Sequence, residues 1–542
     1  MEVVDDARLM ELVREPARDL LPAAHRASVV RPLIVLLSFL PGLLGFWNRP
    51  PDEATCRQGL LGLDVAAGKN PMNWIVTASR GPVDHAVPAF PLATLSTAAA
   101  LRIELISPES RLLLVSYLSS AFLLLSLGGL AKSVGGQRFA LLVVCLACGN
   151  REFLRLSESL PPVALPLAFA ALSFRALLVH QTTPGALVSW SSVASGLALA
   201  ACWLAGGELA LASWFILLMA SLLFVVSPTQ RQTRRTLVLR IRQRLSDLMS
   251  AMMNLFVLTS IAITVVAGWQ TAVLEEISLP SLTEGWAWLR RDWFVESRST
   301  QVVLELFQAV GCWLGFSVLG VLQLIRERAT HRVCANTKGA WFLIGWCCVA
   351  WMCFWMKWPD TQDDLTNSMT GTALPLLPLL FLAAWGLDAV LRREFGLGAV
   401  LTATVVTLGV VSAPRWIVRL PGSVTGEWFA TLVLTGAIVF WFGRLLVRAV
   451  LGSEHLSRKV ISSCVILLVL ADVTNGFTSR RRIADDEREL LAFRRQLIMA
   501  KPPDVCWLMT DQAVPARLQF FLRNLRCRTF VLGARDPETL LY

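Results

Sequence analysis

The stretch TALPLLPLLFLAAWGL, from Thr372 to Leu387, contains no charged side chain. With its flanking residues it is long enough to cross a bilayer as a helix, which takes about 20 mainly apolar residues. The rest of the chain has the same character, because 55% of its 542 residues are hydrophobic and only 16% are charged. Mean hydropathy is +0.58, which lies outside the range of soluble globular domains and indicates a polytopic membrane protein.

Other segments resemble this one, and we predict a transmembrane helix in each, thirteen in all. The predicted helices lie near residues 30–47, 111–130, 139–149, 163–179, 187–205, 210–227, 251–269, 302–325, 340–356, 372–390, 397–412, 428–443 and 460–475. The predicted fold class is therefore an all-α polytopic membrane protein, to which a small α/β domain is added at the C-terminus.

The distribution of basic residues predicts the side of the membrane on which each loop lies. Lys and Arg number 50 against 39 Asp and Glu, and in a membrane protein this excess is typical of cytoplasmic loops rather than of nucleic-acid binding. Basic residues follow the even-numbered helices, so the N-terminus is predicted to be cytoplasmic and the C-terminus extracytoplasmic. The cluster Arg480, Arg481 and Arg482 disagrees, but the upstream loops outnumber it. The absence of an Asn-X-Ser/Thr sequence slightly favours a bacterial cytoplasmic (inner) membrane.

This topology divides the chain into three parts. Residues 1–29 are a cytoplasmic segment, residues 30–475 the transmembrane domain and residues 476–542 the small extracytoplasmic α/β domain. The long loop 48–110 is also extracytoplasmic, and its part PLATLSTAAALRIEL is typical of an amphipathic helix lying along the membrane. In the C-terminal domain, VCWLMT and RTFVL are predicted strands separated by a helix.

Cysteine and acidic residues do not establish a metal or cofactor site. The 12 cysteines show no regular spacing, and most lie inside apolar runs, where they behave as small hydrophobic side chains. Cys506 and Cys527 lie on the two predicted strands, where a disulfide and two unpaired buried thiols are equally consistent with the sequence. Asp360, Asp363 and Asp364 offer the oxygen ligands that a divalent cation prefers, although a solvated acidic turn explains them more simply.

A pair of acids stands where the chain leaves the first predicted helix. In RPPDEATCR, from Arg49 to Arg57, Asp52 and Glu53 emerge on the outer side of the membrane. Most charged residues in loops are simply solvated, so the pair could serve only to end the helix. A carboxylate at the membrane boundary can also act as a general base toward a lipid-linked substrate. The surrounding sequence favours this second interpretation.

Several motifs together resemble the lipid-dependent glycosyltransferases of the GT-C class, most closely the lipid A aminoarabinose transferase and protein O-mannosyltransferase-like group. They are the acid pair, the step Asp84-His85, SPESR (Ser107–Arg111), ASGLALAACWLAGGELAL (Ala194–Leu211) and TALPLLPLLFLAAWGL. The resemblance implies an inverting transfer of a sugar from a polyprenyl-phosphate-linked donor to a lipid, glycan or protein acceptor at the extracytoplasmic face. It also implies that Asp52 is the catalytic aspartate, acting as a base or orienting the acceptor, and that Glu53 shapes its site.

The resemblance further implies a site for the donor phosphate, which leaves with negative charge and needs cations near it. His85 stands where the family often has Lys. A histidine binds phosphate only when protonated, with a reference pKa of about 6.5, and an ordinary interfacial histidine is the alternative. The other candidates are Arg57, Lys69 and Arg80 in the same loop, Arg151 and Arg155 after the third predicted helix, and Glu158 as a second acid.

Departures from the family keep other functions open. Cys56 replaces the Tyr that usually follows the acid pair, and Gly206–Glu208 replaces a Lys-Gly-Pro step. Because these changes and the acidic stretch before Thr372 reduce the number of groups that can bind the phosphate, a non-catalytic lipid-binding protein is one alternative to the transferase. A transporter or flippase of lipid-linked substrates is another, although the chain shows no internal repeat and its charges cluster in loops.

Overall fold

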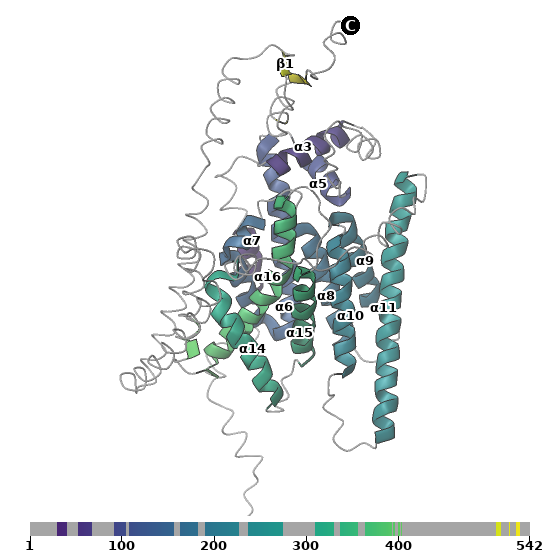
Figure 1. Ribbon diagram of the computed structural model, residues 1–542, viewed down its shortest axis with the longest axis vertical. Coiled ribbons are helices and arrows are strands. Elements are labelled where there is room, and N and C mark those ends of the chain that lie inside the picture. The colour runs from purple at the N-terminus through teal and green to yellow at the C-terminus, as the bar shows by residue number, and fades with distance from the viewer. Residues whose placement is uncertain are drawn as a thin grey trace, which may run out of the picture.

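The computed structural model describes residues 30–40, 53–67, 91–103, 108–156, 163–182, 190–206, 208–226, 237–274, 309–329, 337–355, 364–392, 394–395, 399–400, 403, 506–510, 520 and 527–531. These residues form a helical bundle with two short strands beyond one of its ends (Figure 1). The predicted helices 428–443 and 460–475 lie outside the described residues, so the count of thirteen remains a prediction.

The bundle follows the helices predicted from hydropathy closely. After the helical residues 30–40 come α3 (Glu53–Ala66), α5 (Pro91–Leu101), α6 (Pro108–Gly149), α7 (Arg151–Leu156), α8 (Ala164–Thr182), α9 (Trp190–Gly206), α10 (Glu208–Val226), α11 (Leu237–Leu274), the 3-10 turn η2 (Gly311–Trp313), α14 (Leu314–Ala329), α15 (Thr337–Trp355) and α16 (Asp364–Leu391). Three spans among the described residues are long and apolar enough to cross a membrane, namely Ser110–Gly149, Leu248–Trp269 and Leu374–Leu391. Shorter apolar helices accompany them, and the molecule is an integral membrane protein.

The chain reverses direction inside α6, which is two helices joined by a sharp turn. Gly136 has φ 86° and ψ −174°, a left-handed conformation that favours glycine. A Cβ on Gly128 would lie 3.2 Å from Val144 Cγ2, whereas residues this far apart in a straight helix are separated by roughly 24 Å. The two arms are therefore antiparallel, and they correspond to the separate helices predicted at 111–130 and 139–149.

Aromatic rings and glycines hold the central helices together. Trp346 of α15 lies between two phenyl rings, with centroids 5.4 Å from Phe174 on α8 and 5.3 Å from Phe381 on α16. On the other side of α16, a Cβ on Gly386 would lie 2.1 Å from the carbonyl oxygen of Phe316 on α14. The backbones of α14 and α16 are thus in direct contact. Close approach at small residues is the usual way for membrane helices to gain packing energy, because lipid supplies little hydrophobic drive between them.

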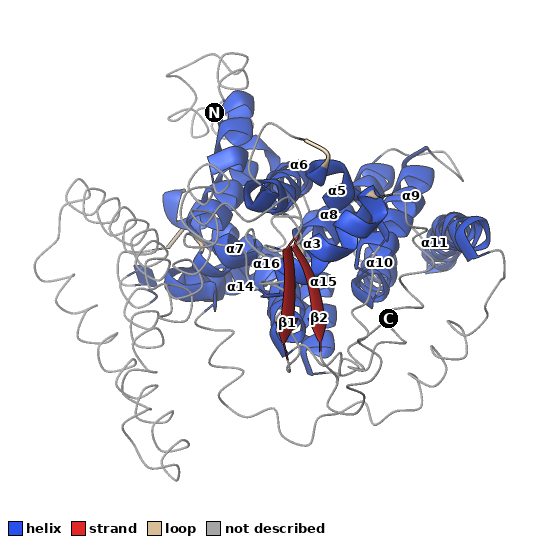
Figure 2. Ribbon diagram, turned by 90° about the horizontal axis from the view of Figure 1, so that it is seen from above, coloured by secondary structure: helices blue, strands red, loops and turns tan. Residues whose placement is uncertain are grey.

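α11 lies at the rim of the bundle (Figure 2) and is attached by side-chain hydrogen bonds. Ser192 Oγ of α9 donates to Asn254 Oδ1 at 2.7 Å, and Trp214 Nε1 of α10 donates to Thr259 Oγ1 at 2.9 Å. Helix α11 starts at Leu237, well before its predicted start at residue 251. Arginines that were assigned to a basic loop therefore extend this helix beyond its apolar part.

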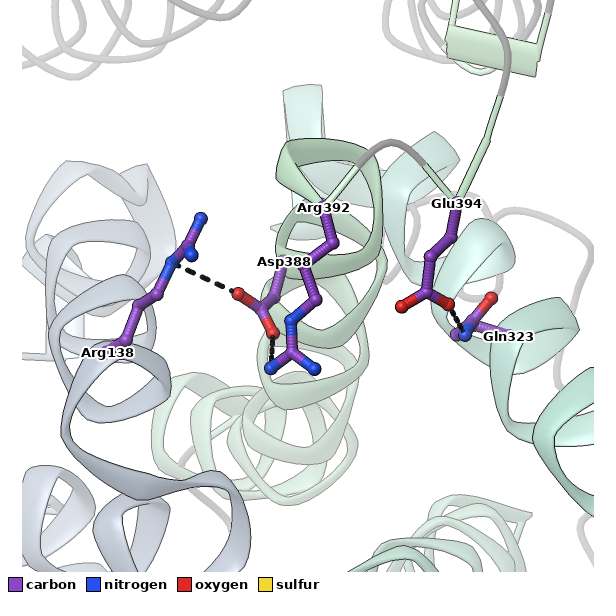
Figure 3. A network of polar contacts seen from close by, with 5 residues as sticks. All are labelled: Arg138, Gln323, Asp388, Arg392 and Glu394. Carbon is purple, nitrogen blue, oxygen red and sulfur yellow. Dashed lines mark hydrogen bonds and ion pairs between the residues drawn. The ribbon is translucent and has the colours of Figure 1, made fainter. Parts of the chain in front are cut away.

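A polar network closes the end of the bundle where α6 reverses (Figure 3). Asp388 of α16 forms ion pairs with Arg138, at 3.3 Å, and with Arg392. Gln323 of α14 donates a hydrogen bond to Glu394 in the segment that follows α16. Arg138 and Arg392 follow the predicted second and tenth helices, so the structure brings together loops that the charge pattern assigned to one side of the membrane.

Two parallel strands lie beyond the opposite end, near α3 and α5 (Figure 1). They are β1 (Cys506–Thr510) and β2 (Cys527–Val531), and Cys506 is the register partner of Cys527. Both strands were predicted. A parallel pair requires a crossover segment between its members, and Phe520, in that segment, is helical. The extent of the C-terminal α/β domain stays a prediction.

Candidate functional site

Helix α3 carries the start of the predicted site and packs against α5. Gln58 Nε2 donates to Thr94 Oγ1 at 3.1 Å, and both side chains are buried. A Cβ on Gly62 would lie 2.7 Å from Thr97 Cγ2, so the two helices touch closely. A helix is thus present, as α5, where the amphipathic helix was predicted, and its Thr94 and Thr97 are turned toward α3 while Leu95 is 40% exposed. Whether its exposed face meets the membrane remains a prediction.

A compact apolar cluster lies beneath α3, and we call it the Phe520 cluster. Its members come from four separate parts of the chain, and they are Cys56, Ala100, Leu101, Leu112, Val115 and Phe520, with Leu60 and Leu63 packed against them. Phe520 and Cys56 both have an exposed fraction of 0%. Cys56 therefore belongs to a packed interior in this chain.

The end of α3 at which the acid pair lies is defined by the backbone. Glu53 is the first residue of α3, and Arg57 is one helical turn further on the same face. Asp52 immediately precedes the described residues of this helix. Asp52, Lys69, Arg80, His85 and Glu158 lie outside the described part of the chain, and their roles remain predictions.

The second basic group of the predicted site is on α7, whose start is fixed by Asn150. The backbone N–H of Phe153 donates to Asn150 Oδ1 at 3.0 Å, which makes Asn150 the N-cap of α7. Asn150 Nδ2 in turn donates to the carbonyl oxygen of Ala309 at 2.8 Å. Arg151 and Arg155 are the first and fifth residues of α7 and lie one turn apart. The cap and the Ala309 contact thus fix the backbone that carries both arginines.

Helix α6 connects the two basic groups along the chain, because α5 meets its start and α7 follows its end. Arg111 at the start of α6 donates through Nη1 to the carbonyl oxygen of Leu101 on α5, at 2.8 Å. Because α6 reverses at Gly136, its second arm runs back from the Arg138 network toward the start of this helix, and α7 follows that arm. The turn between α9 and α10 lies against the start of α8, since a Cβ on Gly206 would lie 2.6 Å from Pro166.

The structure adds no metal centre to these residues. Among the described residues, no group of three or more His, Cys, Asp or Glu side chains could hold a metal ion. Asp364 is the first residue of α16, while Asp360 and Asp363 lie outside the described ranges. The divalent cation proposed for these acids remains untested.

A search of solved structures finds the same fold in a membrane enzyme. ArnT from Cupriavidus metallidurans in the apo state superposes with a TM-score of 0.54 and 15% sequence identity, over 95% of this chain and 87% of that chain. The chain has the fold of ArnT. ArnT is a lipid A aminoarabinose transferase of the GT-C class, which is the group that the sequence motifs resemble.

A second crystal structure of that ArnT, bound to undecaprenyl phosphate, gives a TM-score of 0.49 with the same 15% identity and the same coverage of 95% and 87%. Neither a family model nor a curated protein matches the sequence.

Three residues of the site region escaped sequence reasoning. Asn150 had a local signal, because Asn directly before a helix is a favoured N-cap, but its bond to Ala309 joins segments far apart in the chain. Phe520, and Gly59 of α3, against which the Phe520 ring lies, had no comparable signal. An apolar side chain on a predicted helix indicates a buried face without indicating the partner that covers it.

Proposed function

We propose that this protein is an inverting membrane glycosyltransferase. It transfers a sugar from a polyprenyl-phosphate-linked donor to a lipid, glycan or protein acceptor at the extracytoplasmic face of a bacterial cytoplasmic membrane. The observation that carries the proposal is the ArnT fold, which extends over 95% of the chain. The position of α3, which begins directly after Asp52, agrees with it.

In the proposed reaction, Asp52 receives a proton from the acceptor group or orients it. The acceptor oxygen forms a bond to the anomeric carbon of the sugar, and the bond from that carbon to the phosphate oxygen breaks. The electron pair leaves with the polyprenyl phosphate, and attack from the opposite face inverts the configuration. A carboxylate serves this role when it lies within hydrogen-bond reach of the acceptor.

The departing phosphate carries negative charge that cations must balance. We assign this role to Arg151 and Arg155 on α7, together with Arg57 on α3 and with Lys69, Arg80 and His85 in the outer loop. Glu53 and Glu158 shape the site around them. The i and i+4 spacing of Arg151 and Arg155 on α7 supports this assignment, because that helix then offers two cationic positions to one ligand.

A non-catalytic lipid-binding protein is the second candidate. The observation that favours it is the burial of Cys56 in the Phe520 cluster, at the position where relatives carry Tyr. Such a protein binds the polyprenyl phosphate with the same cations but forms no product.

The decisive experiment uses the full-length protein in nanodiscs with undecaprenyl-phosphate-linked sugars as donors. Asp52→Asn is expected to abolish transfer while leaving the affinity for undecaprenyl phosphate within about twofold, because the acid acts on the acceptor. Asp52→Glu is the matched control and is expected to keep partial activity. Transfer that is unchanged in Asp52→Asn contradicts the assignment, and tight lipid binding without turnover in the parent protein favours the second candidate.

A further inference from the structure

The C-terminal part of the chain reaches into the support of α3 through a single side chain. Phe520 lies between β1 and β2 in the sequence, yet its ring is completely buried among residues of α3, α5 and α6. Leu112 at the start of α6 and Cys56 of α3 are equally buried in this cluster. A residue that follows the transmembrane helices by sequence thus completes the packing of the first outer helix.

Gly59 provides the surface on which this ring rests. A Cβ on Gly59 would lie 2.7 Å from Phe520 Cε2 and 2.8 Å from Leu112 Cδ1, distances that real Cβ atoms do not adopt. The phenyl ring therefore lies directly against the backbone of α3. Gly59 is less than two turns from Glu53, the first residue of the helix. A displacement of the ring is transmitted over this short distance to the end where Asp52 lies.

On its other side, α3 is joined to α5 by the hydrogen bond from Gln58 to Thr94. The close contact of Gly62 with Thr97 adds to that side. Helix α3 is thus held between α5 on one side and, on the other, the Phe520 ring together with Leu112 of α6. Losing the ring leaves a gap against the helix, and a helix that has lost part of its packing on one side is expected to open locally at lower free energy than the bundle.

We infer that Phe520 is a positioning residue for the active site, acting through Gly59 on the helix that follows Asp52. Through this contact, the C-terminal part of the chain controls the position of Asp52 relative to the acceptor. The inference rests on the proposed function in one respect, namely that Asp52 acts on the acceptor.

Cys56 supplies a reporter that does not depend on activity. Its thiol is fully buried in the parent protein, so modification by N-ethylmaleimide, followed by mass spectrometry of the peptide that contains it, is expected to be slow. In Phe520→Ala the rate at Cys56 is expected to rise at least about tenfold, because local opening exposes the thiol. Phe520→Leu is expected to stay near the parent rate. Phe342→Leu, which shortens a buried side chain elsewhere in the helix bundle, is the matched control. It is expected to leave the rate of modification at Cys56 unchanged. Equal rates at Cys56 in all variants overturn the inference.

Steady-state kinetics distinguish a positioning role of Phe520 from a role in stability alone. Phe520→Ala is expected to lower kcat per folded molecule about tenfold or more while KM for the donor changes less than about threefold. Gly59→Ala places a methyl group against both the ring and Leu112 and is expected to show the same defect. Adding Phe520→Leu to Gly59→Ala is expected to restore part of kcat, because the smaller side chain removes one of these two close contacts. A merely structural role lowers the yield of folded protein and leaves kcat per folded molecule intact.

The two proposals fail in different ways. If Asp52→Asn transfers sugar as the parent does but Cys56 is labelled fast in Phe520→Ala, the catalytic role of Asp52 is wrong and the anchoring of α3 by Phe520 stands. If Asp52→Asn loses transfer but Phe520→Ala has the kcat and the labelling rate of the parent, the catalytic role stands and the anchoring is wrong.

Discussion

Asn150 Nδ2 donates a hydrogen bond of 2.8 Å to the carbonyl oxygen of Ala309, while Asn150 Oδ1 caps α7. One fully buried side chain thus joins two distant segments and starts the helix that carries Arg151 and Arg155. Asn150→Ala leaves a buried carbonyl without its donor and removes the cap, and we expect a loss of about 2–4 kcal/mol in the free energy of unfolding.

Asn150→Ser is the matched variant, because its hydroxyl can cap α7 but is too short to reach Ala309. We expect its loss of stability to lie between those of the parent and Asn150→Ala. Thermal unfolding in detergent gives the order of stability of the parent and the two variants. An Asn150→Ala variant as stable as the parent contradicts the structural role of Asn150.

Arg151 and Arg155 are expected to act together on the donor phosphate. Replacing either by Gln should weaken the binding of undecaprenyl phosphate by about tenfold, since one charge-assisted contact contributes about 1.5–3 kcal/mol and the remaining cations compensate in part. The double variant should lose more than either single variant. Arg326→Gln, which removes a cation that contacts the Glu394 carbonyl near the Asp388 network, is the control and should bind as the parent does.

The ion pairs of Asp388 are expected to stabilise the end of the bundle at which α6 reverses. Its side chain is only 10% exposed and is paired with two guanidinium groups, so Asp388→Ala should cost about 1–3 kcal/mol. Arg138→Gln should cost less than about 1 kcal/mol, because that guanidinium is 58% exposed and solvent screens its charge. Unfolding temperatures at low and high salt test this order, and activity per folded molecule should not change.

Cys506 and Cys527 are register partners in the parallel pair β1 and β2. Adjacent strands lie about 4.8 Å apart, within the Cα to Cα range of about 4.4–6.8 Å that a disulfide spans. We expect the two thiols to be oxidised to a disulfide in protein from an oxidising compartment, with the two electrons and two protons passing to a protein disulfide oxidant. Peptide mapping without reduction tests this, with Cys506→Ser as the control, and two freely alkylated thiols favour the unpaired alternative.

Hydropathy predicted much of the described transmembrane architecture. A helix that crosses lipid must be apolar over its own length, so the signal is present in each local stretch of sequence. The helices at 163–179, 187–205, 210–227 and 340–356 correspond to α8, α9, α10 and α15 within a few residues. The ends of α11 and α16 differ from the prediction. Residues such as Arg240 and Asp364 are too polar to be assigned to a span, yet they extend a helix beyond its apolar part without breaking it.

The candidate site was predicted less completely. The sequence placed Glu53 and Arg57 at the exit of the first predicted helix, and the structure places both on α3. It could not indicate that Thr94 bonds to Gln58 or that Phe520 covers Gly59. Such contacts depend on which faces meet after folding, and an apolar or small residue does not identify its partner in advance. The functional hypothesis came from the resemblance of the sequence motifs to the glycosyltransferases, because these contacts alone do not indicate a reaction.

The reversal at Gly136 has a consequence for the sidedness of the chain. A side chain that favoured a continuous helix there would merge the two arms of α6 into one rod of roughly 60 Å, twice the thickness of the hydrocarbon core. Every later span would then enter the membrane from the opposite face. In the predicted topology, the conformation of Gly136 with φ 86° therefore determines the side of the membrane on which each later loop lies, including the one that carries α7 and its arginines.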